Sequence, residues 1–150
     1  MRSVPGVSAP VTQEDLILLL VDGADGPYNV DPVRLMKGCF IISQAGRRPW
    51  RDLFRFRPYD YGPFDSSVYA ARDRLLSEGL LAETRGRYPA YSLTRAGEAR
   101  AAEVAEELGE HDADWVRSIG GYVTSKSFSR LLNEIYERWP DYARNSVMRS

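Results

Sequence analysis

Apolar residues recur with the period of an α-helix along much of the chain. The first helical stretch, Gln13 to Val21, differs in being apolar on every side, with the run Leu-Ile-Leu-Leu-Leu-Val, so we predict a helix buried in the core. Thr12 is placed to cap it, with Asp15 three residues later, an arrangement related to the capping box. Residues 1–11 carry two prolines and a glycine without periodicity, which indicates a flexible arm.

Two further helices are marked by their N-terminal caps. Asp31 followed by Pro32 is a strong helix start, and the apolar spacing predicts a helix that continues to about Ala45. Asp65 caps the next predicted helix, Ser66 to Glu78. Its apolar residues share one arc of the helical wheel, and most of its polar residues fall on the opposite side.

The segment from Arg47 to Tyr61 is the least regular part of the chain. Its two prolines and five aromatic residues show no helical period, and the alternation of Phe54 and Phe56 with arginines suits a short strand. Gly62-Pro63-Phe64 then predicts a break before the next helix.

The second half of the chain predicts a β-hairpin and more helices. Residues 80–84 and 90–93 are expected to be strands around a tip at 85–89, and Thr94 caps a helix to about Leu108. In that helix, alanines at 96, 99, 102 and 105 are expected to make close contacts. A helical segment at 112–119 is predicted to end at Gly120-Gly121, before a last helix that begins at Ser125 or Ser127 and ends near Trp139.

These elements predict a mostly α-helical fold with one small β-hairpin. We expect residues 12–109 to form a winged helix-turn-helix domain and residues 110–150 to form a C-terminal helical extension that serves dimerisation.

A sequence motif supports the winged-helix prediction. Residues 75–81 read Leu-Leu-Ser-Glu-Gly-Leu-Leu and residues 91–97 read Tyr-Ser-Leu-Thr-Arg-Ala-Gly. This resembles the wing region of PadR-like and MarR-like regulators, where a helix ending in Gly-Leu leads into a wing that closes with Tyr-x-Leu-Thr-x-x-Gly. The resemblance implies a recognition helix at about 66–78 and a wing at about 80–93.

A second motif resembles a different family. The helix segment Leu35 to Phe40 and the later Tyr61-Gly62-Pro63-Phe64 are similar to the Panacea antitoxin domain, which has a Leu-x-Lys helix and a Tyr-Gly-Pro turn. The chain departs from that pattern in having a full wing. This weaker resemblance implies toxin binding or another protein-binding role.

Charge is unevenly distributed although the net charge is only −1. Residues 31–60 hold seven basic and three acidic side chains, a net charge of +4, whereas residues 95–114 hold two basic and seven acidic ones, a net charge of −5. Such asymmetry can steer a polyanion to one end of a protein, although solvated helix faces produce the same pattern.

The candidate DNA contacts come from three segments. They are Ser66, Ser67, Ala70 and Arg74 on the predicted recognition helix, Arg85 and Arg87 at the hairpin tip, and Arg47, Arg48 and Arg51 in the segment where arginines alternate with aromatic residues. Each group has a structural alternative: the serines cap their own helix, the hairpin arginines lie in a solvated turn, and Trp50 and Phe54 belong to the core with the arginines outside.

The sequence offers no group of residues suited to catalysis. His111 is the only histidine and lies in an acidic stretch, Cys39 lies on an apolar helix face, and no glycine-rich phosphate loop is present. We therefore expect neither an enzyme nor a cofactor or metal. The apolar run from Leu16 to Val21 is too short to span a bilayer, and a single cysteine fits a reducing compartment, so we expect a cytoplasmic protein without a membrane partner.

The sequence thus predicts a homodimeric transcriptional regulator that binds double-stranded DNA. The alternative is a protein-interaction module on a winged-helix scaffold, such as an antitoxin-like or complex-assembly subunit. Four aromatic residues, Trp115, Tyr122, Phe128 and Tyr136, either line a ligand cavity beside the C-terminal helices or pack in the ordinary way.

Overall fold

The computed structural model describes residues 10–144, and within this range the chain is mostly helical. The helices are α1 (Gln13–Asp22), α2 (Pro32–Ala45), α3 (Arg48–Arg51), α4 (Ser66–Ser77), α5 (Arg95–Leu108), α6 (Glu110–Thr124), α7 (Phe128–Arg138) and a 3₁₀-helix (Pro140–Ala143). Two antiparallel hairpins complete this part of the chain, β1 (Arg57–Tyr59) with β2 (Gly62–Phe64) and β3 (Leu81–Glu83) with β4 (Tyr91–Leu93). The mostly helical class with a small β-hairpin is confirmed, and a second hairpin is added. Residues 1–9 of the expected arm lie outside the described residues, while Val11 packs against the core.

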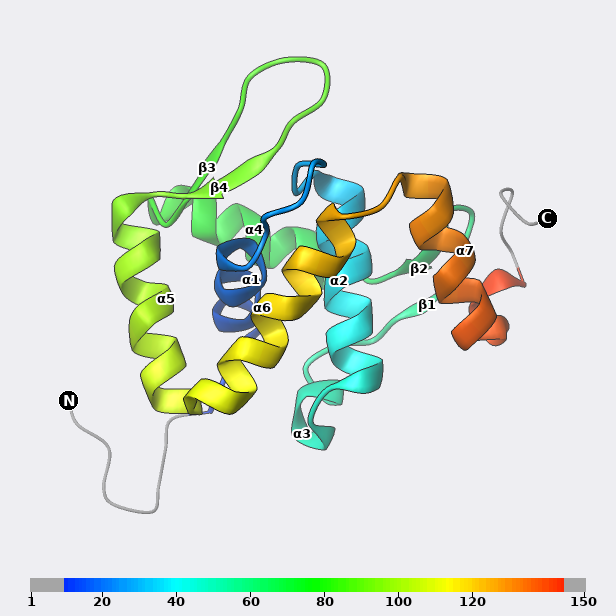
Figure 1. Ribbon diagram of the computed structural model, residues 1–150, viewed down its shortest axis with the longest axis horizontal. Helices are drawn as coiled ribbons and strands as arrows, with labels where there is room; N and C mark the ends of the chain where they lie inside the picture. The colour runs from blue at the N-terminus through cyan, green and yellow to red at the C-terminus, as the bar shows by residue number, and fades with distance from the viewer. Residues whose placement is uncertain (1–9, 145–150) are drawn as a thin grey trace.

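Helix α1 lies at the centre of the molecule, with α5 and α6 beside it and α4 behind it (Figure 1). Every residue from Leu16 to Val21 is buried, which explains why this segment is apolar on all sides. Its capping box is complete: the Thr12 hydroxyl accepts from the Asp15 amide at 3.1 Å, and the Asp15 carboxylate accepts from the Thr12 amide at 3.2 Å.

Helix α6 continues through Gly120-Gly121, so the predicted interruption at these glycines is wrong. At Gly120 the backbone of α6 approaches that of α1 so closely that an added Cβ would overlap the Leu20 carbonyl oxygen. The glycine is therefore needed for close helix packing and not for a break. The helix that follows begins at Ser127, one of the two expected caps, whose hydroxyl accepts from the Arg130 amide at 3.3 Å.

A buried arginine ties the start of α2 to the end of α6. Arg34 donates to the backbone oxygens of Val123 at 3.0 Å and Lys126 at 2.9 Å, and pairs with Asp31, the predicted N-cap of α2, at 2.6 Å. The core is continuous across the boundary expected between residues 109 and 110, because Val104 of α5 and Val116 of α6 belong to the same buried cluster.

The irregular segment folds differently from its prediction. Arg48–Arg51 forms one helical turn with Pro49 near its start, and the strand lies at Arg57–Tyr59 instead of Phe54–Arg57. Gly62-Pro63-Phe64 forms the returning strand and not a break, because Gly62 adopts a φ of +100° and lets the chain reverse. Phe54 and Phe56 stack on each other on the core side, with ring centroids 5.6 Å apart.

Helix α5 buries a different face from the one expected. Ala101 and Ala105 pack in the core with Gly97 and Val104, while alanines 96, 99 and 102 are exposed. The predicted contact role of those three alanines is therefore wrong within the described chain. Across residues 10–144, none of the helices combines the length and apolar character that a membrane crossing requires.

Candidate nucleic-acid interface

Helix α4 is held at its N-terminus by one buried carboxylate. Asp65 is only 8% exposed, and its Oδ1 accepts from the amide of Ser67 at 2.9 Å and from the hydroxyl of Ser67 at 2.7 Å. Its Oδ2 accepts from the amide of Arg55 at 2.6 Å. Asp65 thus caps the helix as predicted and also ties it to the segment that leads into β1.

The outward face of α4 is polar and nearly neutral. Ser66, Ala70, Asp73, Arg74 and Ser77 are exposed, whereas Val68, Ala71 and Leu75 are buried against the core. Ser67 is half-buried, and its hydroxyl is also the acceptor for the Gln13 side-chain amide at 2.9 Å. The structure therefore brings Ser66, Ala70 and Arg74 together on one surface and turns Ser67 toward α1.

Both arginines of α4 have acidic partners. Arg74 pairs with Glu14 of α1 at 2.9 Å, and Arg72 pairs with Asp73 at 2.9 Å. Arg72 also donates to the Tyr91 hydroxyl at 3.1 Å and stacks on Tyr69, with its guanidinium 4.5 Å from the ring centroid. With Glu14 of α1 included, these charges balance, and α4 presents no excess positive charge.

The β3–β4 hairpin projects from the body of the protein beyond the end of α4 (Figure 1). Its tip is closed by the Thr84 amide, which donates to the Ala90 carbonyl at 2.9 Å, and by the Ala90 amide, which donates to the Thr84 hydroxyl at 2.9 Å. Arg85 and Arg87 are both exposed at this tip. Neither forms an ion pair with any residue between 10 and 144.

The base of this hairpin explains the Tyr-x-Leu-Thr-x-x-Gly motif. The Tyr91 amide donates to the Val30 carbonyl at 2.8 Å, which attaches β4 to the loop before α2. The Thr94 hydroxyl donates to the Gly79 carbonyl at 2.6 Å and accepts from the Gly97 amide at 2.9 Å, so it caps α5 as predicted. A Cβ on Gly97 would overlap the Leu80 carbonyl oxygen, which is why this position requires glycine.

The third group of candidate DNA contacts, Arg47, Arg48 and Arg51, lies away from the tip of the β3–β4 hairpin. Helix α3 is at the end of α2 that points away from the β3–β4 hairpin (Figure 1), so the structure does not bring these arginines to the hairpin tip. Arg47 pairs with Asp112 of α6 at 2.6 Å. Arg51 donates to the carbonyl oxygens of Ser43 and Gln44 at 3.4 and 3.2 Å, and Arg48 is exposed.

The exposed aromatic residues are not the ones that the sequence pattern indicated. Trp50 and Phe54 are buried, which is the structural alternative named for them. Instead, all the large hydrophobic side chains exposed within the described range are tyrosines: Tyr28, Tyr59, Tyr61 and Tyr88. Sequence reasoning missed them as site residues. The Tyr-Asp-Tyr triplet at 59–61, between Arg57 and Gly62, was the sequence signal that could have indicated two of them.

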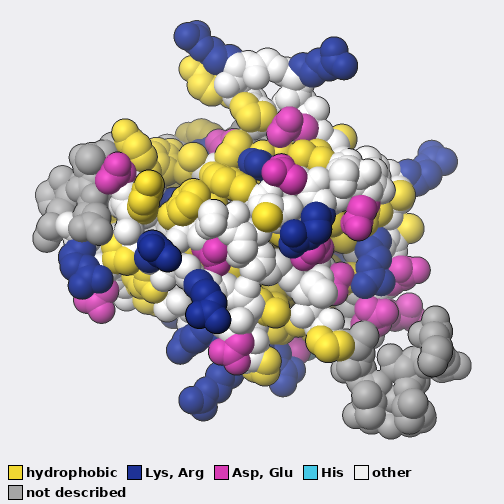
Figure 2. All heavy atoms as spheres, turned by 180° about the vertical axis from the view of Figure 1, so that it is seen from behind, with side chains coloured by type: hydrophobic (Ala, Val, Ile, Leu, Met, Phe, Trp, Pro, Cys, Tyr) yellow, Lys and Arg dark blue, Asp and Glu magenta, His cyan; other side chains and the backbone are white. Residues whose placement is uncertain are grey.

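The face behind that of Figure 1 carries mixed charge (Figure 2). Basic side chains stand at the tip of the β3–β4 hairpin and are spaced over the surface below it, with acidic side chains among them and a band of hydrophobic side chains below the hairpin. On this face, positive charge is therefore scattered and does not form one continuous patch (Figure 2).

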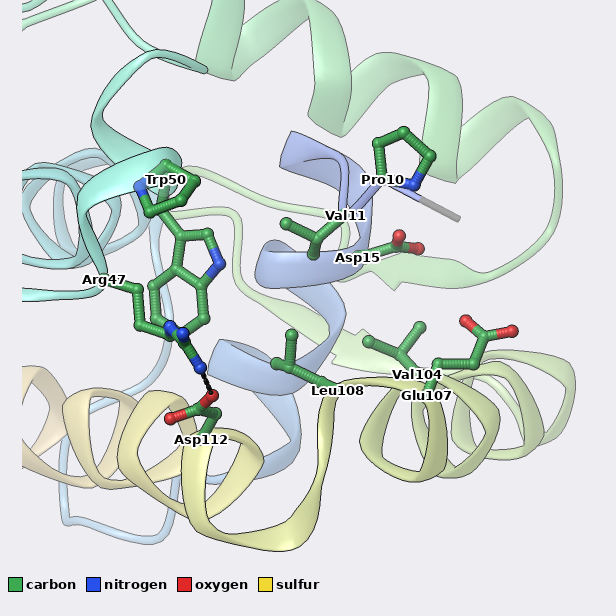
Figure 3. Close-up of a pocket in the computed structure, with 10 residues that line it drawn as sticks. Pro10, Val11, Asp15, Arg47, Trp50, Val104, Glu107, Leu108 and Asp112 are labelled. Carbon is green, nitrogen blue, oxygen red and sulfur yellow. Dashed lines mark hydrogen bonds and ion pairs between the residues drawn. The ribbon is translucent and has the colours of Figure 1, made fainter. Parts of the chain in front are cut away.

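One pocket lies where α1, α3 and the α5–α6 junction meet (Figure 3). It has a volume of about 290 Å³, and Trp50 and the Arg47–Asp112 ion pair form one side of it. Its other carboxylates, Asp15 and Glu107, both contact Arg100, at 3.2 and 3.7 Å. Because each charged side chain that lines the pocket already has an ion-pair partner, the pocket does not single out a charged ligand.

A second cavity of about 340 Å³ lies between α2, α6 and α7. Trp115 and Tyr122 line it, together with Trp139, while Phe128 and Tyr136 are not among its lining residues. The Tyr122 hydroxyl donates to Glu134, which also contacts Lys126 and Arg130. Burial raises the pKa of the Tyr122 hydroxyl, and the hydrogen bond and negative charge of Glu134 raise it further, against a smaller opposing effect of Arg138 and Arg130.

The single cysteine and histidine do not form a site together. Cys39 is fully buried, and burial raises the pKa of its thiol, with the nearby Asp65 carboxylate adding to the effect. His111 is exposed on α6. Among residues 10–144, no group of three histidine, cysteine or acidic side chains is arranged to hold a metal ion.

Arg85 and Arg87 are thus exposed at the tip of the hairpin that follows α4, without an ion-pair partner among residues 10–144. No protein-family model, no curated protein and no solved structure matches the chain.

Proposed function

We propose that this protein is a transcriptional regulator that binds double-stranded DNA through a winged-helix arrangement. Helix α4 serves as the recognition helix and the β3–β4 hairpin as the wing. The observation that carries the proposal is the pair Arg85 and Arg87, exposed at the tip of a hairpin that projects beyond the end of α4 (Figure 1) and without an acidic partner among residues 10–144. Unpaired arginines on a projection are free to displace the counterions of a phosphate backbone.

The division of labour follows from where the charges lie. The arginines of the wing supply the salt-dependent affinity, because phosphate contacts dominate binding energy and carry no sequence information. Ser66, Ala70 and Ser77 face outward on α4. The two serine hydroxyls can hydrogen-bond to base edges, and the alanine methyl group can make an apolar contact with them. Arg74 joins them by exchanging Glu14 for a phosphate, since an ion pair between exposed side chains contributes little to stability.

The expected homodimer is part of the proposal. A single winged helix covers a short site, and two copies on a pseudo-palindromic operator reach useful affinity. Gel filtration and DNA stoichiometry measure this directly: one dimer per operator is the expected result.

The test is a fluorescence-anisotropy titration of random duplex DNA at several salt concentrations. Wild type is compared with Arg85→Ala/Arg87→Ala and with Arg130→Ala/Arg144→Ala, which removes the same charge from exposed positions at and after α7. We expect the wing variant alone to weaken binding and to reduce the slope of log K against log salt by about 2, at about 1 per lost phosphate contact. If both variants lose the same DNA affinity, the loss reflects the change in net charge alone, which contradicts a contact between the wing and DNA.

A protein-interaction module is the second candidate function. The observation that favours it is the composition of the exposed surface, where tyrosines are the exposed large hydrophobic residues of the described range and Tyr88 reaches 80% exposure. Tyrosine and arginine together are typical of interface anchors. A purified protein that binds no duplex at low salt, but recovers one stoichiometric partner through Tyr88, would favour this function over the first.

A further inference from the structure

The β1–β2 hairpin directly precedes α4 in the chain, and the β3–β4 hairpin follows it. Its strands pair in the register Arg57 with Phe64, Pro58 with Pro63 and Tyr59 with Gly62, and the chain then passes through Asp65 into the helix. Because side chains two residues apart share a face of a strand, Arg57 and Tyr59 lie on the same side, and both are exposed. Helix α4 therefore has one exposed arginine-bearing hairpin at each end.

A row of ring contacts connects the two hairpins along one flank of α4. Tyr59 stacks on Phe64 with ring centroids 5.3 Å apart, and Phe64 meets the edge of Tyr69 at 5.7 Å. Arg72 continues the row, with its guanidinium 4.5 Å from the Tyr69 centroid and 5.9 Å from that of Tyr91 in β4. The row shows that both hairpins border the same flank of the helix.

The β1–β2 hairpin is held rigidly in this position. Lys37 of α2 is buried, and its Nζ donates to the Pro63 carbonyl at 3.1 Å. A Cβ at Gly62 would lie 2.6 Å from Leu132 Cδ1 and 2.9 Å from Lys37 Cε, so α2 and α7 close tightly over the turn. The Leu-x-Lys helix and the Tyr-Gly-Pro turn are separate in the sequence but contact each other in the structure.

The charges of the hairpin suit an anionic partner. Arg55 and Arg57 are exposed and form no ion pair with the described residues, and the hydroxyl of Tyr59, a residue 54% exposed, adds a hydrogen-bond donor. Asp60, in the turn, is the single acidic side chain between Arg55 and Phe64. The hairpin therefore shares two exposed arginines and an exposed tyrosine with the tip of β3–β4, where Arg85, Arg87 and Tyr88 are exposed.

We propose that the β1–β2 hairpin is a second DNA-backbone-binding element, in which Arg57 and Tyr59 contact phosphates at the end of α4 opposite the wing. The inference rests on the proposed function and adds to it a contact that no motif assigned. Helix α4, at 1.5 Å per residue, is about 18 Å long. A major groove about 12 Å wide admits the diameter of a helix, so α4 would lie lengthwise in it, with basic side chains of a hairpin at each end of that length.

Substitutions at two oppositely charged residues of the hairpin, Arg57 and Asp60, test this proposal. Arg57→Ala removes a phosphate contact, so we expect the salt slope to fall by about 1 and affinity at about 0.1 M salt to drop on the order of fivefold. Arg57→Lys keeps the charge and should retain most of the affinity. Asp60→Asn removes repulsion of the phosphates and should strengthen binding, whereas Glu137→Gln, which alters the same charge on an exposed position of α7, should leave it unchanged.

The outcomes separate this inference from the function on which it rests. If the wild type binds no duplex DNA at low salt, the proposed function itself is wrong. If it binds and the wing variant is weakened while Arg57→Ala and Asp60→Asn match wild type, the function stands and the second element is refuted. If Asp60→Asn and Glu137→Gln strengthen binding equally, the effect is one of net charge, and the hairpin contact is likewise refuted.

Discussion

The packing of α6 on α1 makes a sharp prediction about two neighbouring glycines. A Cβ at Gly120 would overlap the Leu20 carbonyl oxygen and lie 3.0 Å from the Leu20 carbonyl carbon and 3.1 Å from the Ala24 amide nitrogen. All three are backbone atoms, which cannot rotate away. A Cβ at Gly121 would instead meet the Asp25 side chain at 3.1 Å and the Gly23 carbonyl oxygen at 3.6 Å, and the Asp25 carboxylate is free to shift.

The two Gly→Ala substitutions therefore have opposite expected effects. Replacing a helical glycine by alanine gains about 1 kcal/mol in helix propensity. At Gly121 this gain should remain, so we expect a change in unfolding free energy between zero and about 1 kcal/mol in favour of the variant. At Gly120 the methyl group forces α1 and α6 apart, and overpacking of this kind costs roughly 1–3 kcal/mol, occasionally more.

We expect the overpacking cost to exceed the propensity gain, because the overlap at Gly120 is with rigid backbone in the centre of the core. Gly120→Ala should lose about 2 kcal/mol, which for a chain of this size lowers Tm by roughly 4–8 °C. Urea unfolding followed by tryptophan fluorescence measures both variants under the same conditions. If the two variants agree within about 0.5 kcal/mol, α6 does not pack on α1 as described, and the helix break that the sequence pattern predicted would be the better account.

Two further predictions concern buried titratable groups. Burial lowers the pKa of Lys37 to about 8 from 10.5, so between these values the unfolded chain binds more protons than the folded one, and the free energy of unfolding should rise with pH. The full shift corresponds to about 3 kcal/mol. In urea unfolding from pH 7.5 to 9.5, the unfolding free energy of the wild type should therefore rise relative to that of Lys37→Met, which shares every other titrating group, and parallel pH profiles would contradict this. Cys39 is fully buried with a raised pKa, so a thiol reagent should label it only at the rate of unfolding, and fast labelling of native protein would show an accessible thiol.

Local signals were enough to predict most helix starts. Thr12, Asp31, Asp65 and Thr94 all cap helices as their side chains and neighbours indicated, because a cap depends on hydrogen bonds within three residues. The β3–β4 hairpin was predictable for a similar reason, since its two strands are joined by a short polar tip. For the candidate site, these local signals predicted helix α4 and the position of Arg85 and Arg87 at the hairpin tip, but not the residues that surround them.

The sequence predicted poorly wherever distant segments meet. Local propensity predicts a break at Gly120-Gly121 because it disfavours glycine in a helix, and nothing near these glycines in sequence shows that Leu20 packs there. The β1–β2 hairpin was missed because its strands have three residues each and contain two prolines. Arg47 and Arg51 were grouped with the DNA contacts by their neighbours, while their partners lie on α6 and at the end of α2.

The sequence alone thus determined the helical class, the caps, the all-round burial of α1 and the presence of a hairpin after α4, since each depends on periodicity or on contacts a few residues apart. Tertiary structure decided which charges remain available to a partner. Arg34, Arg47 and Arg74 find acidic or carbonyl partners within the fold, whereas Arg57, Arg85 and Arg87 do not among residues 10–144. The reason is physical: a side chain's charge is a property of its residue, but whether that charge is neutralised depends on the residues that folding brings within about 4 Å of it.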